Sequence, residues 1–300
     1  MFRTNLINKI PKVKGDLITN AILAKSSWFR VGGPAEVLFV PRDEVDLVKF
    51  IKELDPKIPL LVLGATSNVL IRDGGIKGVV IKLGANFNQI TITKNNIKAG
   101  GAVMDMKIAS FAAKKGIGGM EFLSGIPGSI GGSVKMNAGA YGGDISDILY
   151  RIKLLERNGK VLEVGVSDLR MRYRNSSIPK YSIIVEVELK GHEENQKVIF
   201  NKIKEINITR SSTQPIRNLT GGSTFKNPLG FKAWELIDQA GCRGLRVGGA
   251  KISETHPNFI INEGKAISSD IENLGIEVQN RVMDHSGIKL KWEILRLGSK

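Results

Sequence analysis

The chain has 300 residues, an ordinary apolar fraction of 42% and a formal net charge of +15. This length allows one large domain or two to three small ones, and the composition argues against a disordered chain. No apolar run reaches the roughly 20 residues that cross a bilayer, and the N-terminal segment lacks the apolar core of a signal peptide. Because Cys242 is the single cysteine, we expect no disulfide framework, no cysteine metal cluster and a reduced, cytoplasmic compartment.

The positive charge suits an anionic partner, either nucleic acid or a small phosphorylated ligand. The basic residues are spread along the chain, and the sparse aromatic residues do not alternate with them as a base-stacking surface would require. We therefore expect small phosphorylated ligands and no nucleic acid, and keep a basic nucleic-acid-binding protein as an alternative.

The first half of the chain alternates short apolar strands with helices. Strands are predicted at 35–40, 60–63, 78–83, 89–93 and 96–99. Asp43 is predicted to cap a helix between the first two strands, which makes a β-α-β unit. The inward face of that helix has apolar residues at helical spacing: Leu47, Phe50, Ile51 and Leu54. A second helix is expected from Asp105, as its cap, to Lys115.

The second half begins with a hairpin, because Asn158-Gly159 separates the apolar runs 150–156 and 161–164. A strand at 182–189 follows, and then a helix at 193–206 with Ile199, Ile203 and Ile206 on its inward face. The polar stretch 209–220 predicts a domain boundary, which gives domains 1–208 and 209–300. The second domain should contain a helix at 233–239, a helix with Ser269 and Glu272 as a capping box, and a strand at 289–297. The buried stripe of the capped helix is predicted to be Ile271, Leu274, Val278 and Val282. This pattern indicates an α+β protein.

A stretch from Gly118 to Gly143 contains nine glycines in 26 residues. Glycine costs conformational entropy, so such a cluster indicates left-handed turns or a backbone lying close against a ligand. A flexible linker is the alternative, but the stretch also carries large apolar residues that a tether lacks. We interpret it as a wall of backbone N–H groups that holds a large cofactor.

A second loop, 64–68, follows the buried strand 60–63 and has small residues whose N–H groups can converge on an anion. Neither loop matches the dinucleotide fingerprint or the P-loop motif. Two such loops in one domain favour a dinucleotide held in another fold. Metal chemistry is not expected, because the three histidines, His192, His256 and His285, are far apart in sequence.

Seven short motifs occur in an order that identifies a family. They are SWFRVGG (27–33), GATSNVL (64–70), GIPGSIGG (125–132), NAGAYG (137–142), YRNS (173–176), GSTFKNP (222–228) and HPNFIIN (256–262). Together they resemble the UDP-N-acetylenolpyruvoylglucosamine reductases, flavoenzymes of peptidoglycan precursor synthesis, over nearly the whole chain.

The resemblance implies an FAD-binding fold of the vanillyl-alcohol oxidase type with two α+β subdomains, followed by a C-terminal α+β substrate domain. It assigns FAD to the two glycine-containing loops, with these residues as cofactor-binding candidates: Gly64, Thr66, Ser67, Asn68, Gly125, Gly128, Ser129, Gly131, Gly132, Asn137 and Gly139. Neither loop contains histidine or cysteine, so non-covalent FAD is expected.

The reaction implied by the resemblance has two halves. NADPH gives a hydride to FAD, and the reduced flavin gives a hydride to C3 of the enolpyruvyl group of the UDP-sugar. Charge then passes through C2 into the substrate carboxylate, where it needs cationic or hydrogen-bonding stabilisation, and C2 needs a proton donor.

Three residues match the catalytic positions of the family. Ser223 would protonate C2, and Arg174 with Glu293 would stabilise the enolate. By pattern alone Ser223 is a turn serine, and Glu293 lies on the solvated face of the last strand. Trp292 departs from the proline that many members have before this glutamate.

Closure over the UDP diphosphate is not readable from the motifs. The substrate-binding candidates are Lys226, Asn227, His256 and Asn258. No inserted segment follows Tyr181, so the chain resembles the shorter of the two family types. We expect a monomer without membrane insertion, and keep an FAD-dependent oxidase of a sugar or hydroxy acid as the alternative.

Overall fold

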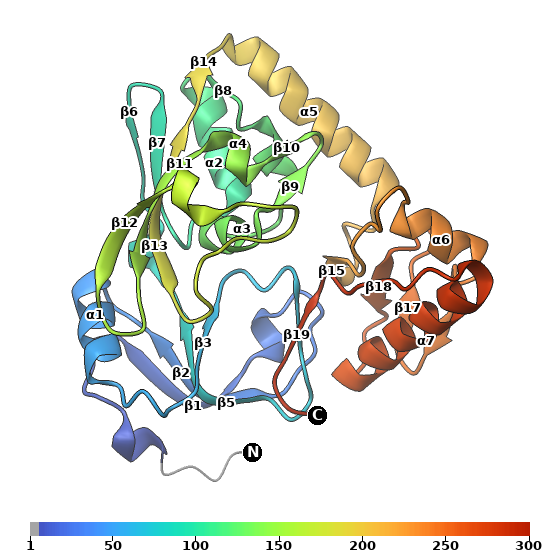
Figure 1. Cartoon of the computed structure of the whole chain (residues 1–300), viewed down its shortest axis with the longest axis horizontal. Helices are drawn as coiled ribbons and strands as arrows, with labels where there is room; N and C mark the ends of the chain where they lie inside the picture. The colour runs from blue at the N-terminus through green and yellow to red at the C-terminus, as the bar shows by residue number, and fades with distance from the viewer. Residues whose placement is uncertain (1–5) are drawn as a thin grey trace.

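Three multistranded sheets, each with its own helices, organise the computed structural model of the chain, which describes residues 6–300 (Figure 1). The first five residues of the expected domain 1–208, and with them the start of the N-terminal segment, lie outside the described residues. In the order of the chain, we call the three parts the first, second and third units. The long helix α5 (Gln196–Thr213) runs from the second unit to the third.

The first unit is a four-stranded sheet in the order β1-β2-β5-β3. Its strands are β1 (Asp16–Ile22), β2 (Pro34–Val40), β3 (Leu60–Leu63) and β5 (Ile76–Lys82). Helix α1 (Glu44–Glu53) joins β2 to β3 as predicted, and the carboxylate of its cap, Asp43, accepts the Asp46 N–H at 2.8 Å. Strand β5 lies between β2 and β3, parallel to both. All four predicted inward residues of α1 are buried.

The second unit is a five-stranded antiparallel sheet in the order β12-β11-β13-β7-β6. Its strands are β6 (Ile90–Thr93), β7 (Asn96–Gly100), β11 (Leu149–Leu155), β12 (Val161–Gly165) and β13 (Ile183–Lys190). The predicted hairpin is confirmed by the antiparallel pairing of β11 with β12. Helices α2 (Asp105–Lys114), α3 (Ile130–Met136) and α4 (Ile145–Ile148) lie together beside this sheet (Figure 1).

The predicted role of Asp105 as a helix cap is wrong. Met104 occupies the N-cap position of α2, and Asp105 is the first helical residue. Its carboxylate is buried and accepts a hydrogen bond from Ser133 Oγ at 2.6 Å. The side chain therefore joins α2 to α3 instead of closing the end of α2.

The glycine-rich stretch is neither a tether nor a continuous extended wall. It contains α3, the 3-10 helix η4 (Glu121–Gly125) and the short strands β9 (Gly139–Ala140) and β10 (Gly143–Asp144), and it starts at the end of β8 (Ile117–Gly118). Leu123 and Ile130 are fully buried in the core of the second unit. Burial of these apolar side chains excludes the flexible-linker alternative.

Helix α5 is longer than predicted and begins three residues later. It follows the short strand β14 (His192–Glu193), which pairs with β8. Of the three predicted inward residues, only Ile199 is buried, whereas Ile203 and Ile206 are half-buried. The helix passes without interruption through position 208, and the domain boundary there stays a prediction.

The third unit is a four-stranded sheet in the order β15-β18-β17-β16. Its strands are β15 (Leu219–Ser223), β16 (Arg246–Val247), β17 (Ala250–Ile252) and β18 (Phe259–Asn262). Helices α6 (Ala233–Gln239) and α7 (Ser268–Ser286) share its core. The predicted buried stripe of α7 is confirmed, since Ile271, Leu274, Val278 and Val282 are fully buried.

The predicted capping box of α7 is wrong. The N–H groups of Ser268 and Ser269 donate to the carboxylate of Asp73, a residue of the first unit, at 2.8 and 2.9 Å. Glu272 instead accepts two hydrogen bonds from Arg72 and one from Arg296. Asp73 and Arg72 lie about 200 positions before their partners in the sequence, and their contacts attach the third unit to the first.

The predicted strand at 289–297 is largely replaced by an irregular segment. Only β19 (Leu295–Leu297) is a strand, and it pairs in parallel with β4 (Val69–Ile71) of the first unit. The segment therefore runs from the third unit back to the first, carrying Glu293 between them. The remaining one-turn helices are η1 (Leu6–Lys9), η2 (Ala24–Ser26), η3 (Ala85–Phe87) and η5 (Val166–Leu169). Across residues 6–300, no helix is both long and apolar enough to span a membrane.

Candidate active site and cofactor cavity

The two glycine-containing loops meet at Ser129. The backbone N–H of Ala65 donates to Ser129 Oγ at 3.3 Å. A Cβ atom added at Gly64 would lie 2.5 Å from the same oxygen, so only glycine fits there without displacement. Loops 64–68 and 125–132 are thus joined by a direct contact, although 64 positions separate the bonded residues.

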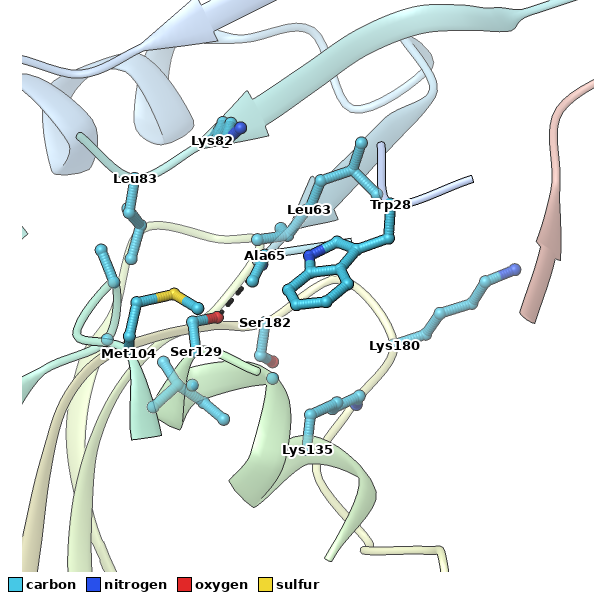
Figure 2. Close-up of a pocket in the computed structure, with 17 residues that line it drawn as sticks. Trp28, Leu63, Ala65, Lys82, Leu83, Met104, Ser129, Lys135, Lys180 and Ser182 are labelled. Carbon is cyan, nitrogen blue, oxygen red and sulfur yellow. Dashed lines mark hydrogen bonds between the residues drawn. The ribbon is translucent and has the colours of Figure 1, made fainter. Parts of the chain in front are cut away.

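A cavity of about 370 Å³ opens at this junction (Figure 2). Its backbone wall includes Gly64, Gly101, Gly131 and Gly132, and its apolar wall includes Val62, Leu63, Leu83, Ile184 and the ring of Trp28. Three lysines, Lys82, Lys135 and Lys180, add positive charge at its edge. Backbone donors, apolar walls and lysines together suit a ligand with a diphosphate and flat rings.

Burial lowers the pKa of both Lys82 and Lys135 below the ordinary lysine value. The Lys135 ammonium also donates to the carbonyl oxygens of Ile178 and Pro179, at 3.0 Å for the latter. Sequence reasoning did not find these lysines, since lysines occur throughout the chain. Trp28, in contrast, lies in the motif SWFRVGG (27–33), so the sequence contained a signal for this residue.

The other cofactor candidates build the frame around the cavity and do not line it. Asn137, in a left-handed conformation, donates to the Arg172 carbonyl at 3.2 Å and accepts the Ser146 N–H at 3.0 Å. Thr66, also left-handed, is buried and directs its hydroxyl at the Ser26 carbonyl at 2.9 Å. Three of the glycines allow a side chain to approach the backbone closely: Tyr141 at Gly125, Asp105 at Gly128 and Asp144 at Gly139. Ser67 and Asn68 contact the C-terminal part of the chain, since the Ser67 carbonyl lies near Gly222 and Asn68 Nδ2 donates to the Glu293 carbonyl.

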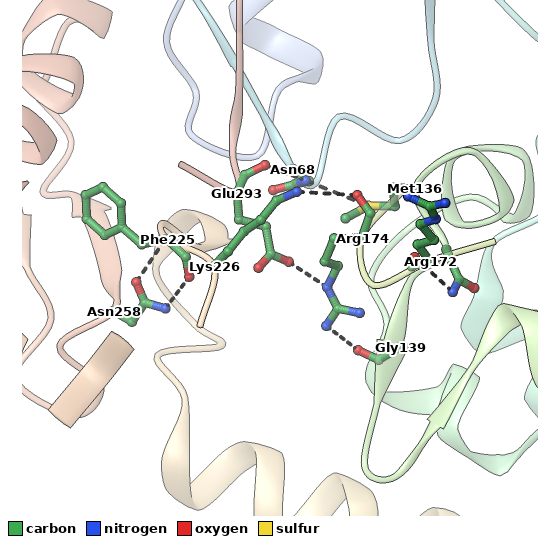
Figure 3. Close-up of polar contacts among 10 residues, drawn as sticks. Asn68, Met136, Gly139, Arg172, Arg174, Phe225, Lys226, Asn258 and Glu293 are labelled. Atoms are coloured by element: carbon green, nitrogen blue, oxygen red, sulfur yellow. Dashed lines mark hydrogen bonds and ion pairs between the residues drawn. The ribbon is translucent and has the colours of Figure 1, made fainter. Parts of the chain in front are cut away.

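The three catalytic candidates come from different parts of the chain and gather beyond this loop. Arg174 Nε donates to Glu293 Oε1 at 2.9 Å, and Arg174 Nη2 donates to the Gly139 carbonyl at 2.7 Å (Figure 3). Asn68 Nδ2 donates to the Glu293 carbonyl at 3.2 Å. The Arg174–Glu293 pair is therefore in contact with both loops of the cofactor cradle.

Glu293 is half-buried, contrary to its solvated position in the predicted strand pattern. Its side chain is 12% exposed, and that of Arg174 is 19% exposed. Burial raises the pKa of the Glu293 carboxyl above its ordinary value, against the opposing effects of Arg174 and Lys226. A carboxyl of raised pKa beside an arginine is a common feature of catalytic sites.

Ser223 lies at the end of β15, half-buried and close to loop 64–68. A Cβ atom at the neighbouring Gly222 would lie 3.8 Å from the Ser67 carbonyl oxygen. The Glu293 N–H donates to the Thr224 carbonyl at 2.8 Å, so the residue after Ser223 is bonded directly to the backbone of Glu293. Lys226 Nζ reaches the Arg174 carbonyl at 3.4 Å.

Of the four substrate candidates, only Lys226 reaches the catalytic group. Asn258 is buried and exchanges two hydrogen bonds of 2.9 Å with the backbone of Phe225 (Figure 3). Asn227 accepts the Ala233 N–H at the start of α6 at 2.9 Å. His256 lies edge-on between Trp234 and Phe259, and burial lowers its pKa. The two amides are thus occupied in holding the chain around Ser223.

Comparisons with known proteins agree on one family. Residues 214–297 match the C-terminal domain of UDP-N-acetylenolpyruvoylglucosamine reductase, and residues 35–165 match an FAD binding domain. The chain is 48% identical to the reductase of that name from Gluconobacter oxydans and 49% identical to that from Methylorubrum extorquens. Each alignment covers 96% of this chain and 94% of the relative. The crystal structure of UDP-N-acetylenolpyruvylglucosamine reductase from Thermus caldophilus superposes with a TM-score of 0.83 at 31% identity, over 96% of this chain and 100% of that chain.

Proposed function

The chain belongs to the UDP-N-acetylenolpyruvoylglucosamine reductase family, and from that premise we propose which of its residues carry the reaction. It is an FAD-containing, NADPH-dependent oxidoreductase that reduces UDP-N-acetylglucosamine enolpyruvate to UDP-N-acetylmuramate in peptidoglycan precursor synthesis. The expected α+β fold, with an FAD-binding domain followed by a C-terminal domain of the family, is confirmed, and the vanillyl-alcohol oxidase type of the FAD-binding domain stays a prediction. The oxidase alternative is not favoured.

FAD, when bound, relays a hydride from NADPH to the enolpyruvyl group. The residues of the cavity suit this cofactor, because glycine backbones allow close approach and the lysines offset phosphate charge. Gly64, Ser129, Gly131 and Gly132 would hold the diphosphate from the backbone. The other candidates of the two loops would keep this wall in shape. Among the described residues that line the cavity there is neither histidine nor cysteine, so FAD would be held without a covalent bond.

Arg174 and Glu293 form the electrostatic part of the site. Negative charge develops on the substrate carboxylate when C3 receives a hydride, and Arg174 supplies a fixed cation for it. Glu293 can assist only as the neutral acid, since a carboxylate would repel an enolate. Its raised pKa favours that form, and its free oxygen can then donate a hydrogen bond.

Ser223 is the proposed proton donor to C2. A serine hydroxyl is a weak acid, but the carbanion that it protonates is very basic. Its position on the segment that is bonded to Glu293 supports this role. The single observation that carries the assignment is the 2.9 Å hydrogen bond from Arg174 to Glu293 beside that segment.

Ser223→Ala tests the assignment by separating the two half-reactions. We expect NADPH to reduce the bound flavin at the normal rate, because that step needs no proton donor at C2. Flavin reoxidation by the enolpyruvyl substrate should slow by about 10²–10⁴, as for a lost general acid. Rapid mixing with absorbance of the flavin measures both steps, and equal loss in both would contradict the role of Ser223.

Monomeric state and compartment belong to the same proposal. We assign the enzyme to the cytoplasm, where NADPH and nucleotide sugars are made and where an unpaired cysteine such as Cys242 stays reduced. The site is assembled within one chain, which supports a monomer. Light scattering at several concentrations tests the monomer, and cell fractionation tests the compartment.

A further inference from the structure

Trp292 stands immediately before Glu293. Its ring centroid lies 5.1 Å from that of Phe225, and the Arg296 guanidinium lies 4.4 Å from it on the ring face. On helix α7, Gly275 approaches the indole so closely that a Cβ atom there would lie 2.1 Å from it. The indole is therefore enclosed by three different segments of the chain.

Gln279 of α7 holds the indole and the chain next to it. Trp292 Nε1 donates to Gln279 Oε1 at 3.0 Å, and Gln279 Nε2 donates to the Leu290 carbonyl at 2.7 Å. One amide thus binds both ends of the short segment from Leu290 to Trp292. Because the apolar face of α7 packs in the core of the third unit, this segment is fixed to a rigid element.

The backbone of Trp292 also lies at the centre of a short ladder of hydrogen bonds. Trp292 and Phe225 form an isolated antiparallel bridge. On either side of it, the Lys226 N–H donates to the Lys291 carbonyl and the Glu293 N–H donates to the Thr224 carbonyl, both at 2.8 Å. These backbone hydrogen bonds consequently hold the segment that carries Ser223 and Lys226 against the segment that carries Glu293.

Opposite this ladder, Arg174 comes from the second unit, and side-chain hydrogen bonds of Arg174 and Lys226 link the two sides at this point. The Arg174–Glu293 bond of 2.9 Å spans the gap (Figure 3). A small shift of the ladder would change that distance and the path from Ser223 to the substrate. Displacements of about 1 Å at a catalytic group can cost about 100-fold in rate.

We infer that Trp292 is a positioning residue of the reductase reaction: clamped on α7 by Gln279, its indole sets where Glu293 meets Arg174 and where Ser223 stands. This inference rests on the proposed roles of Arg174, Ser223 and Glu293. The rival explanation is that Trp292 only fills the core of the third unit, in which case its loss affects stability alone.

Two variants test the inference at different points of the clamp. Trp292→Phe keeps an aromatic ring against Phe225 and removes the Nε1 donor. Gln279→Met removes both clamp bonds at a half-buried position and leaves the indole in place. The matched control is Ile237→Val, a fully buried residue of the same core without a contact to the ladder among the described hydrogen bonds and ring contacts. Glu293→Ala is the reference for loss of the positioned group.

We expect flavin reduction by NADPH to stay within about twofold in both clamp variants. Flavin reoxidation by the enolpyruvyl substrate should fall by about tenfold to 100-fold, with kcat reduced more than KM is raised. The alkaline limb of the pH profile for reoxidation should be displaced, because the surroundings of Glu293 change. Hydrogen exchange at the amides of Lys226 and Glu293 should quicken more than in Ile237→Val.

The variants distinguish failure of the inference from failure of the proposed function. If Glu293→Ala slows reoxidation and the clamp variants do no more than Ile237→Val, the inference fails while the proposed function stands. If Glu293→Ala leaves reoxidation unchanged, the proposed function fails and the inference with it. Should Trp292→Phe not fold, Gln279→Met alone decides between positioning and core filling.

Discussion

Arg174 Nε donates to Glu293 Oε1 at 2.9 Å, although the two residues are 119 positions apart and belong to different units of the fold. Arg174 Nη2 is bonded to the Gly139 carbonyl at 2.7 Å, so the guanidinium is held on two sides. The Arg174 backbone has a φ of 54°, a left-handed conformation that costs a non-glycine residue on the order of 1 kcal/mol. The surrounding contacts thus maintain a fixed arginine fork at the site.

Arg174→Lys should separate charge from geometry. Lysine keeps the positive charge but cannot bond Glu293 and Gly139 at once from a planar fork. We expect flavin reduction by NADPH to be preserved and reoxidation by the enolpyruvyl substrate to slow by about 10²–10³, as for a lost oxyanion donor. Rapid-mixing kinetics measures both steps. Wild-type reoxidation in this variant would mean that charge alone suffices.

Glu293 predicts a pH dependence with a defined sign. Burial raises the pKa of its carboxyl, so the neutral, donating acid persists above the ordinary carboxyl range and is lost as pH rises through the raised pKa. The rate of flavin reoxidation should therefore fall on the alkaline side. Glu293→Gln keeps a donor that does not titrate, so this limb should disappear, whereas Glu293→Ala should be slow at every pH. An unchanged alkaline limb in Glu293→Gln would contradict the assignment.

Gly64→Ala should weaken FAD binding through Ser129. The new Cβ would lie 2.5 Å from Ser129 Oγ and would displace the hydroxyl that accepts the Ala65 N–H. We expect an increase in the FAD dissociation constant of about tenfold, measured by quenching of flavin fluorescence and equivalent to about 1.4 kcal/mol.

The double variant Gly64→Ala with Ser129→Ala removes the overlap. It should recover part of the lost affinity, because contacting residues are not additive. Gly165→Ala is the control, since a Cβ atom there meets only ordinary contacts outside the cavity. Additive losses in the double variant would show that the overlap is not the cause.

Asp105 predicts a change of stability with pH. Burial raises its pKa to about 7, with Ser133 opposing the shift, from an ordinary value of 3.8. Between these values the folded protein holds a proton that the unfolded chain has released, so this group lowers stability as pH rises from about 4 to 7. The full effect is roughly 4 kcal/mol.

Asp105→Asn removes the titration. Relative to the wild type, the variant should gain stability as pH rises through this window and then keep a constant difference. Urea unfolding of both proteins at pH 5 and pH 8 measures the effect. Parallel stability curves for the two proteins would refute it.

Features that depend on neighbours in sequence were predictable. Asp43 caps α1 because its partner N–H lies three residues away, and the stripe of α7 is buried because apolar residues recur at helical spacing. The hairpin of β11 and β12 follows from Asn158-Gly159. The ordered motifs also identified the family and the three catalytic candidates before any geometry was known.

Only the tertiary structure decided the roles that depend on distant partners. The alternating pattern predicted Glu293 as a solvated residue, yet contacts with Arg174 and the ladder around Trp292 leave its side chain only 12% exposed. Asp105, Ser269 and Glu272 were predicted as caps, but each is bonded to a residue of another element. Ser133 Oγ donates to Asp105, the Ser269 N–H donates to Asp73, and Arg72 donates to Glu272. The physical reason is that local spacing determines which face of an element is apolar. The charge state and partner of a polar group depend on what the fold brings against that face.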